Sequence, residues 1–258
     1  MTRETEEKLA CSLTAETTEL LPFLPYLLQD FWELGSEPDV IAGLIQKYVR
    51  LSGDTKILDL ACGKGAVSVK VAERLSVKVK GVDLIPAFTA YAAQKAKEYG
   101  VDDLCAFTVE DINETVEREE DYDCVIFGAA GSVLGDHAET LDKLKAVIKT
   151  GGHILIDECY LPDNGKREDV RYSPDAYLTE KEWAALFREK GLDLVETVFS
   201  DDSGSDSGMA ALTARANELI EQHPDKKAVF EGYIRSQQNE YDDIDNSLVA
   251  VTWILRKL

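Results

Sequence analysis

The chain has 258 residues, 45% of them hydrophobic, which is enough to bury one large core and favours one domain with an appendage over two domains. Its 28 Lys and Arg residues face 49 Asp and Glu residues, and the net charge of -21 repels phosphate backbones and anionic lipid, so we expect neither nucleic acid nor membrane as a partner. No apolar run reaches the roughly 18 residues of a membrane span, and the acidic N-terminus is unlike a signal peptide, so we expect a cytoplasmic protein. The five cysteines form no CxxC pair and no Cys/His cluster, so we expect no disulfide framework and no metal site.

Residues 1–50 are predicted to form two or three helices. One of them is expected to begin at Glu37-Pro38, because proline is favoured in the first turn of a helix. The segment before it is rich in aromatic residues, namely Phe23, Tyr26, Phe31 and Trp32. Core packing accounts for these rings, and a lid over a ligand is the alternative.

The clearest local pattern follows Lys56. The run Ile57-Leu-Asp-Leu60 is typical of a buried strand, and the chain then becomes small and glycine-rich up to Gly65. Apolar spacing over 67–74 predicts a helix packed on a sheet. A glycine-rich turn between a strand and a helix lets a ligand approach bare backbone and the helix N-terminus, so we expect a nucleotide-like ligand here.

Strand and helix patterns then alternate along the chain. Further strands are expected at 77–84, 106–109, 121–128, 153–160 and 192–199, and a helix over 138–149 is expected to end at Thr150-Gly151-Gly152. This alternation predicts a parallel sheet with right-handed crossovers. The second strand ends in Asp83, 20 residues beyond Gly63, and in nucleotide-binding βαβ units a carboxylate at this spacing meets the ribose hydroxyls.

The last part of the chain departs from this alternation. A final strand is expected at 247–256, and before it comes an acidic loop over 200–208 and two helices over 209–222 and 225–241. We therefore expect a single domain in four parts: a helical segment (1–50), a cofactor-binding core (51–200), a helical insertion (201–246) and a final strand (247–258).

Four of these motifs, in order and at fitting intervals, resemble those of class I S-adenosylmethionine-dependent methyltransferases of the small-molecule kind. Asp59-Leu-Ala-Cys-Gly-Lys-Gly65 is similar to the acid-x-Gly-x-Gly-x-Gly signature, with Ala61 replacing the first glycine. The later motifs correspond to Val82-Asp83, Glu110-Asp111-Ile112 and 148–156. The exchange at Ala61 is harmless provided that this position does not need a positive φ. The resemblance implies an α/β fold with a Rossmann-like, seven-stranded, mostly parallel sheet, helices on both faces and an antiparallel last strand.

The resemblance also implies S-adenosylmethionine as the cofactor and assigns residues to its parts. For the methionine end, it assigns the backbone of Ala61 and Gly63, with Asp59 near the ammonium group and Phe127 and Gly128 close by. For the ribose, it assigns Asp83. For adenine, it assigns Leu84, Asp111 at the amine and Ile112 beside the ring. A nicotinamide dehydrogenase is the competing interpretation. Its Gly-x-Gly-x-x-Gly motif would correspond to Ala61, Gly63 and Ala66, so two of its three glycines are missing.

Methyl transfer needs a base only if the acceptor must lose a proton. His137, Asp157, Glu158 and Tyr160 are the candidates near the carboxyl edge of the sheet. The pKa range of histidine suits His137 to the role of base, and a helix-capping or surface role is the alternative. Glu158 and Tyr160 are expected to orient an acceptor amine or hydroxyl.

The acceptor itself is not encoded in a motif. The acidic composition leaves small neutral or cationic metabolites as the expected acceptors, with a non-catalytic S-adenosylmethionine-binding interaction or sensor module as the alternative function. The insertion, together with the N-terminal aromatic segment, is expected to cap the acceptor. A solvated helical hairpin and a homodimer contact are the alternatives for it.

Overall fold

The computed structural model describes residues 2–200 and 205–258, which divide into two compact units. The first comprises residues 32–158, 183–198 and 251–258 and contains most of the sheet, so we call it the sheet unit. The second comprises the described residues before 32, residues 159–182, and the described part of 199–250, and we call it the helical unit.

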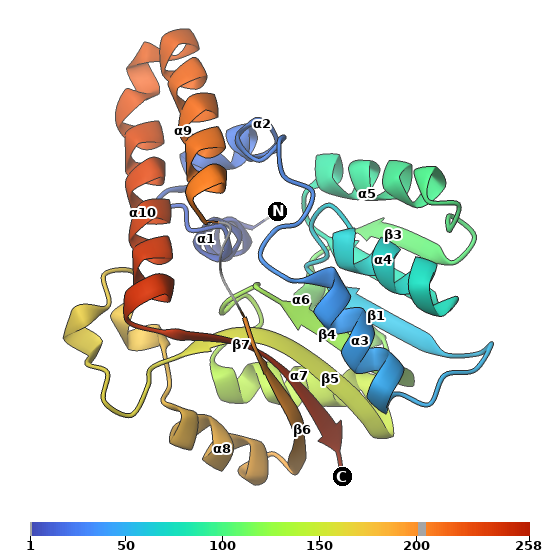
Figure 1. Cartoon of the computed structure of the whole chain (residues 1–258). Helices are drawn as coiled ribbons and strands as arrows, with labels where there is room; N and C mark the ends of the chain where they lie inside the picture. Colours follow the sequence, from blue (N-terminus) through green and yellow to red (C-terminus); the bar gives the residue numbers. More distant parts are fainter. Residues whose placement is uncertain (1, 201–204) are drawn as a thin grey trace. The chain divides into compact units, whose positions relative to one another are not determined.

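In the described part of the chain, seven strands form one sheet in the order β3-β2-β1-β4-β5-β7-β6 (Figure 1). They are β1 (Lys56–Leu60), β2 (Lys78–Asp83), β3 (Cys105–Val109), β4 (Tyr122–Gly128), β5 (Ile148–Tyr160), β6 (Leu192–Phe199) and β7 (Val249–Lys257). Strand β1 pairs in parallel with β2 and β4, β2 pairs in parallel with β3, and β4 pairs in parallel with β5. Strand β7 runs antiparallel, so the predicted Rossmann-like fold class is confirmed.

Helices flank this sheet. They are α3 (Pro38–Tyr48), α4 (Ala66–Leu75), α5 (Pro86–Glu98), α6 (Ile112–Arg118), α7 (His137–Val147) and α8 (Glu180–Glu189). The apolar sides of α3 and α4 share one hydrophobic core with Ile57 of β1 and Leu155 of β5. Because side chains alternate along a strand, Asp59 lies on the same face of the sheet as Ile57. An acidic side chain is therefore buried under α3 and α4 at the carboxyl end of β1.

Strand β5 begins earlier than the sequence predicts. It starts at Ile148 rather than at His153, and α7 correspondingly ends at Val147. Ile148 pairs with Tyr122 of β4, and the register shifts between Tyr122 and Cys124. The two glycines before His153 thus lie within an irregular stretch of the strand, where Gly151 adopts a φ of 76°, and they do not end the helix.

The helical unit contains the N-terminal segment and the insertion. Its main elements are α1 (Arg3–Ser12), η1 (Thr18–Phe23), α2 (Leu24–Leu27), α9 (Ser205–Gln222) and α10 (Lys227–Asn246), with α9 and α10 forming a pair (Figure 1). The Phe23 ring lies 5.1 Å from the ring of Phe230 and 5.2 Å from that of His223. Packing therefore accounts for this N-terminal aromatic residue. Of the loop predicted over 200–208, residues 201–204 lie outside the described residues, and α9 already begins at Ser205.

Candidate active site

The turn after β1 has an unusual backbone. Ala61, Gly63 and Gly65 have φ values of 56°, 52° and 73°, all in the left-handed region. Gly65 is the N-cap of α4, and its amide donates a hydrogen bond of 2.8 Å to the Cys62 carbonyl. The condition that made the exchange at Ala61 harmless is therefore not met, because this position does adopt a positive φ. An L-residue pays a conformational cost there that glycine would not pay.

Replacing Ala61 by glycine should therefore stabilise the protein. The gain from relieving the left-handed strain, about 1–2 kcal/mol, is partly offset by the greater freedom of glycine in the unfolded chain, which leaves a net gain of roughly 0.5 kcal/mol in the free energy of unfolding. The matched control is Ala90→Gly on the exposed side of α5, which should lose about 0.5–1 kcal/mol. Urea denaturation measures both variants, and a loss of stability in Ala61→Gly would contradict the account of the turn.

Asp83 holds the same turn in place from the end of β2. Its Oδ2 accepts a hydrogen bond of 2.8 Å from the Gly63 amide, and its Oδ1 accepts one of 2.8 Å from the Ile85 amide. The side chain is only 8% exposed, and burial raises the pKa of its carboxyl against the opposing effect of the backbone donors. The contact of Asp83 with ribose stays a prediction. In the structure, Asp83 also fixes the conformation of the glycine turn through these two hydrogen bonds.

Asp59 is the most strongly perturbed carboxylate of the turn. It is 3% exposed and accepts a hydrogen bond of 2.5 Å from the Ser68 hydroxyl of α4. Burial raises the pKa of Asp59 to about 7, and the charges of Asp83 and Asp157 add to the rise. A buried carboxylate with neighbouring negative charges is stabilised by a cationic ligand.

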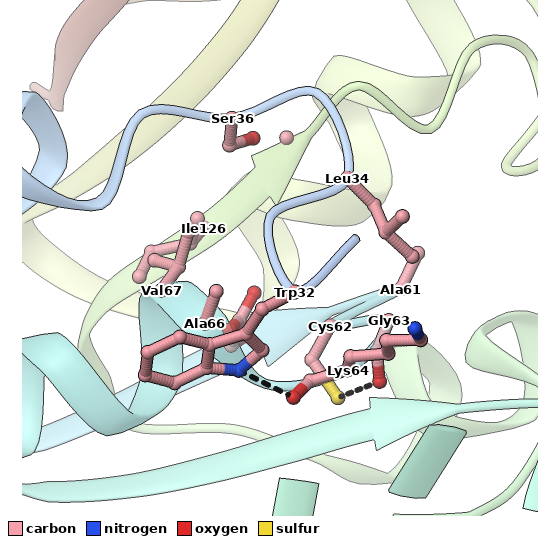
Figure 2. A pocket seen from close by; sticks show the side chains of 12 residues that line it. Trp32, Leu34, Ser36, Ala61, Cys62, Gly63, Lys64, Ala66, Val67 and Ile126 are labelled. Atoms are coloured by element: carbon pink, nitrogen blue, oxygen red, sulfur yellow. Dashed lines mark hydrogen bonds between the residues drawn. The ribbon is translucent and has the colours of Figure 1, made fainter. Parts of the chain in front are cut away.

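The cavity over the turn is lined entirely by residues of the sheet unit (Figure 2). They are Trp32, Leu34, Ser36, Asp59, Ala61, Cys62, Gly63, Lys64, Ala66, Val67, Ile126 and Gly128. The structure thus brings together four residues that the sequence assigns to the methionine end of the cofactor, namely Asp59, Ala61, Gly63 and Gly128. Leu34 and Ser36 were missed, because no motif marks a segment that reaches the site from outside the sheet.

The segment 32–36 lies over the glycine turn and is anchored at Trp32. The Trp32 indole N–H donates a hydrogen bond of 3.1 Å to the Lys64 carbonyl (Figure 2), and its ring lies 5.2 Å from that of Tyr99. The Leu34 Cδ1 atom would be only 3.2 Å from a Cβ built on Gly63. The cavity holds about 40 Å³, whereas ligand pockets usually hold several hundred. We therefore predict that Leu34 fills space that a ligand over Gly63 needs and that it moves when one binds.

Shortening Leu34 should consequently favour binding. For Leu34→Ala we expect S-adenosylhomocysteine to bind about fivefold more tightly. In wild type, displacing the half-buried leucine side chain takes about 1 kcal/mol from the binding free energy, and the variant avoids this loss. Leu51→Ala is the matched control, since Leu51 is also half-buried and packs on a hydrophobic core but does not line the cavity, so the ligand affinity of this variant should stay unchanged. Calorimetric titration measures both, and weaker binding by Leu34→Ala would show that this side chain is a ligand contact rather than an obstacle.

The residues predicted for the adenine end lie on neighbouring elements. Asp111 is the N-cap of α6 and accepts a hydrogen bond of 2.9 Å from the Asn113 amide, and Ile112 is 5% exposed at the start of that helix. Leu84 is half-buried after β2, and Phe127 is 4% exposed near the end of β4. Their contacts with a cofactor stay predictions.

The three catalytic candidates lie outside the cavity over Gly63. His137 begins α7, and its ring lies 4.6 Å from the ring of Trp183, at the edge of an aromatic group with Phe187 and Trp253. Glu158 is half-buried on β5 in the sheet unit, whereas Tyr160 at the end of β5 belongs to the helical unit and is 7% exposed. None of them lines the cavity over Gly63. Their catalytic roles remain predictions.

The residues present fit the cofactor that the resemblance implies. The backbone of the glycine turn is open to a ligand once Leu34 moves, and the buried carboxylate of Asp59 suits a ligand with cationic groups. The fold and this site define the class as a Rossmann-like α/β protein that binds a nucleoside-containing ligand at the carboxyl edge of its sheet.

Comparison with known proteins gives the family. Residues 51–198 match a family described as a methyltransferase domain, and the chain belongs to that family. With its sheet order and glycine turn, it is a class I S-adenosylmethionine-dependent methyltransferase.

The chain is also similar to individual proteins and to solved structures. The chain is 28% identical over 200 residues to YjhP of Escherichia coli K12, covering 75% of this chain and 79% of that protein. It is 26% identical to phosphoethanolamine N-methyltransferase 1 of Triticum aestivum, over 78% of this chain but only 39% of the wheat protein. In fold it is similar to a methyltransferase from Geobacter sulfurreducens in complex with S-adenosylhomocysteine, with a TM-score of 0.76, 23% identity and coverage of 92% and 98% of the two chains.

Within residues 2–200 and 205–258, no helix combines the length and apolar character that crossing a bilayer requires. In the same residues, no group of His, Cys, Asp and Glu side chains is arranged to hold a metal ion.

Proposed function

We propose that this methyltransferase transfers the methyl group of S-adenosylmethionine to a small neutral or cationic acceptor by in-line displacement. The observation that carries the proposal is the cavity over Gly63, where the glycine turn and the buried carboxylate of Asp59 meet. The net charge of -21 supports an acceptor that is not a polyanion. The wheat relative, named for the small molecule phosphoethanolamine, supports a small-molecule acceptor.

The cofactor supplies an already activated methyl group on a sulfonium centre, so the protein's part is alignment and exclusion of water. Well-oriented reactants gain on the order of 7–11 kcal/mol from alignment. In this chain, Asp83 fixes the glycine turn, and Asp59 offers its charge to the cationic end of the bound ligand. The segment 32–36 covers the turn from outside and keeps bulk water from it.

The role proposed for the helical insertion is to cap the acceptor. Support comes from its sequence pattern, because a long connection with helical periodicity is usually functional. Hydrogen exchange over residues 209–241, with and without an acceptor, tests this role. Protection that does not change when the acceptor binds would count against the cap.

Turnover tests the proposed function itself. The protein is incubated with S-adenosylmethionine and a pool of small metabolites, and S-adenosylhomocysteine and methylated products are measured by mass spectrometry. We expect S-adenosylhomocysteine to accumulate only when the pool is present. Tight binding of S-adenosylmethionine without turnover across broad pools would instead favour a binding or sensor module.

A further inference from the structure

A second carboxylate, the half-buried side chain of Asp157, lies on the same face of the sheet as Asp59. Asp59 pairs with Ile126 of β4, Ile126 pairs with Leu155 of β5, and Gly128 pairs with Asp157. Since side chains alternate along each strand, Asp157 shares the face of Leu155 and Asp59, while its neighbour Glu158 points to the opposite face. Of the two acids at the end of β5, Asp157 is therefore the one on the cavity side.

The carboxylate of Asp157 is only half satisfied. Its Oδ1 accepts a hydrogen bond of 2.5 Å from the hydroxyl of Thr252, which is itself 3% exposed on β7. Its Oδ2 is shielded from solvent and meets no donor in hydrogen-bond geometry among the residues that the structure describes, although the Ser36 hydroxyl is near enough to lower the pKa of the carboxyl. An unsatisfied buried oxygen of a carboxylate is costly, and such an atom in a native protein calls for a ligand or another specific explanation. Thr252 fixes the orientation in which Oδ2 is presented.

The unpartnered oxygen borders the cavity. A Cβ built on Gly128 would lie 2.8 Å from Asp157 Oδ2 and 2.1 Å from the Ser36 hydroxyl oxygen, so only glycine fits at this position. Gly128 and Ser36 both line the cavity over Gly63. The Ser36 hydroxyl occupies the space in front of Gly128, so a ligand group comes within reach of Oδ2 there only when Ser36 moves aside.

The surroundings of Asp157 favour a cation. The charge of Asp157 contributes to the raised pKa of Asp59, and the charge of Glu37 adds to the raised pKa of Asp157, after burial as the main cause. The one cationic side chain that lines the cavity in the described residues, Lys64, has its Nζ 5.0 Å from the Tyr91 ring centroid. A positively charged hydrogen-bond donor in front of Gly128 would satisfy Oδ2 and reduce the repulsion between the two carboxylates.

We propose that Asp157 binds, through Oδ2, a protonated amino group of a ligand held in this cavity. The inference rests on the proposed function, which supplies two sources for such a group: the amino group of the cofactor's methionine part and an amine acceptor. Carboxylates and phosphates are excluded from this position by charge.

The test compares wild type with Asp157→Asn, which keeps the shape and an acceptor for Thr252 but removes the charge. Calorimetric titration uses S-adenosylhomocysteine, which carries the amino group, and 5′-methylthioadenosine, which lacks it. If the cofactor supplies the amine, the variant binds S-adenosylhomocysteine about 10- to 100-fold more weakly and 5′-methylthioadenosine equally well. If an acceptor supplies it, S-adenosylhomocysteine binding is unchanged, but ethanolamine binds to the wild-type complex and not to that of the variant, with ethylene glycol as the neutral control.

Stability separates binding from a purely structural role. The free Asp157→Asn protein should melt at a higher temperature than wild type, because an unpaired buried charge is gone. Loss of binding together with a lower melting temperature would overturn the proposal, as would a variant that matches wild type with S-adenosylhomocysteine and ethanolamine alike. Failure of wild type to bind S-adenosylhomocysteine at all would instead contradict the proposed function.

Discussion

Asp59→Asn is expected to weaken S-adenosylhomocysteine binding by 100-fold or more while making the free protein more stable. The carboxylate is buried, and in the bound state it is expected to face the ammonium group of the methionine moiety, so its removal leaves that cation without its partner, at a cost of about 3 kcal/mol or more. Calorimetric titration measures the loss. Ser68→Ala is the matched control, because it removes the hydrogen bond to Asp59 and keeps the charge, and it should cost much less affinity.

The gain in stability follows from the pKa of Asp59, which is raised from 3.8 to about 7. Between pH 3.8 and pH 7, Asp59 is ionised in the unfolded chain but still protonated in the folded protein. Asp59 therefore lowers the stability of wild type progressively as the pH rises through this range. The cost is absent below pH 3.8 and reaches its full size, about 4 kcal/mol, above pH 7. Asp59→Asn has no such cost, so its advantage in urea denaturation should be about 2 kcal/mol larger at pH 8 than at pH 5.5. An advantage that does not depend on pH would contradict the assignment.

The same protonation should appear in ligand binding. Only ionised Asp59 attracts a cation, so the wild-type affinity for S-adenosylhomocysteine should fall about tenfold between pH 8 and pH 6. The Asp59→Asn variant should lose this dependence. Titrations of both proteins at the two pH values check the expectation, and a parallel fall in both would point to another group.

Asp83 is expected to show the second large effect, and it acts on two properties at once. In Asp83→Ala the amides of Gly63 and Ile85 lose their acceptor, so the protein should lose roughly 3 kcal/mol of stability, and ligand affinity should fall by a further 1.5–3 kcal/mol if the carboxylate holds the ribose. Asp83→Asn keeps one acceptor oxygen and relieves the burial of a charge, so its stability should stay close to that of wild type.

The ribose contact can be isolated by changing the ligand. Wild type should bind adenosine more tightly than 2′-deoxyadenosine, and the difference should shrink in Asp83→Asn, as measured by thermal shift. An equal preference for adenosine in both proteins would mean that Asp83 supports the turn but does not touch the sugar.

The sequence predicted most of the fold because its strands carry strong local signals. Continuous apolar runs mark β1 and β4, and glycine and proline mark the turns beside them, so these elements could be located from the chain alone. The start of β5 was predicted wrongly because two glycines usually end a helix, whereas here the pairing of Ile148 with Tyr122 keeps the strand extended before them.

For the site, physical reasons also explain which residues could be predicted from the sequence and which could not. Residues on the glycine turn could be predicted, since their spacing follows from the geometry of one strand and one helix. Leu34 and Ser36 could not, because their place over Gly63 and Gly128 depends on how a segment without periodicity folds back on the sheet. The left-handed conformation of Ala61 was also hidden, because alanine gives no local sign of a positive φ.

A crystal structure of the protein with bound S-adenosylhomocysteine tests the central claim most directly. We expect the homocysteine chain to lie over Gly63 with the Leu34 side chain moved aside, and the ribose hydroxyls to meet the Asp83 carboxylate. Density for the ligand at any other place, with Leu34 still in contact with the turn, would contradict the account.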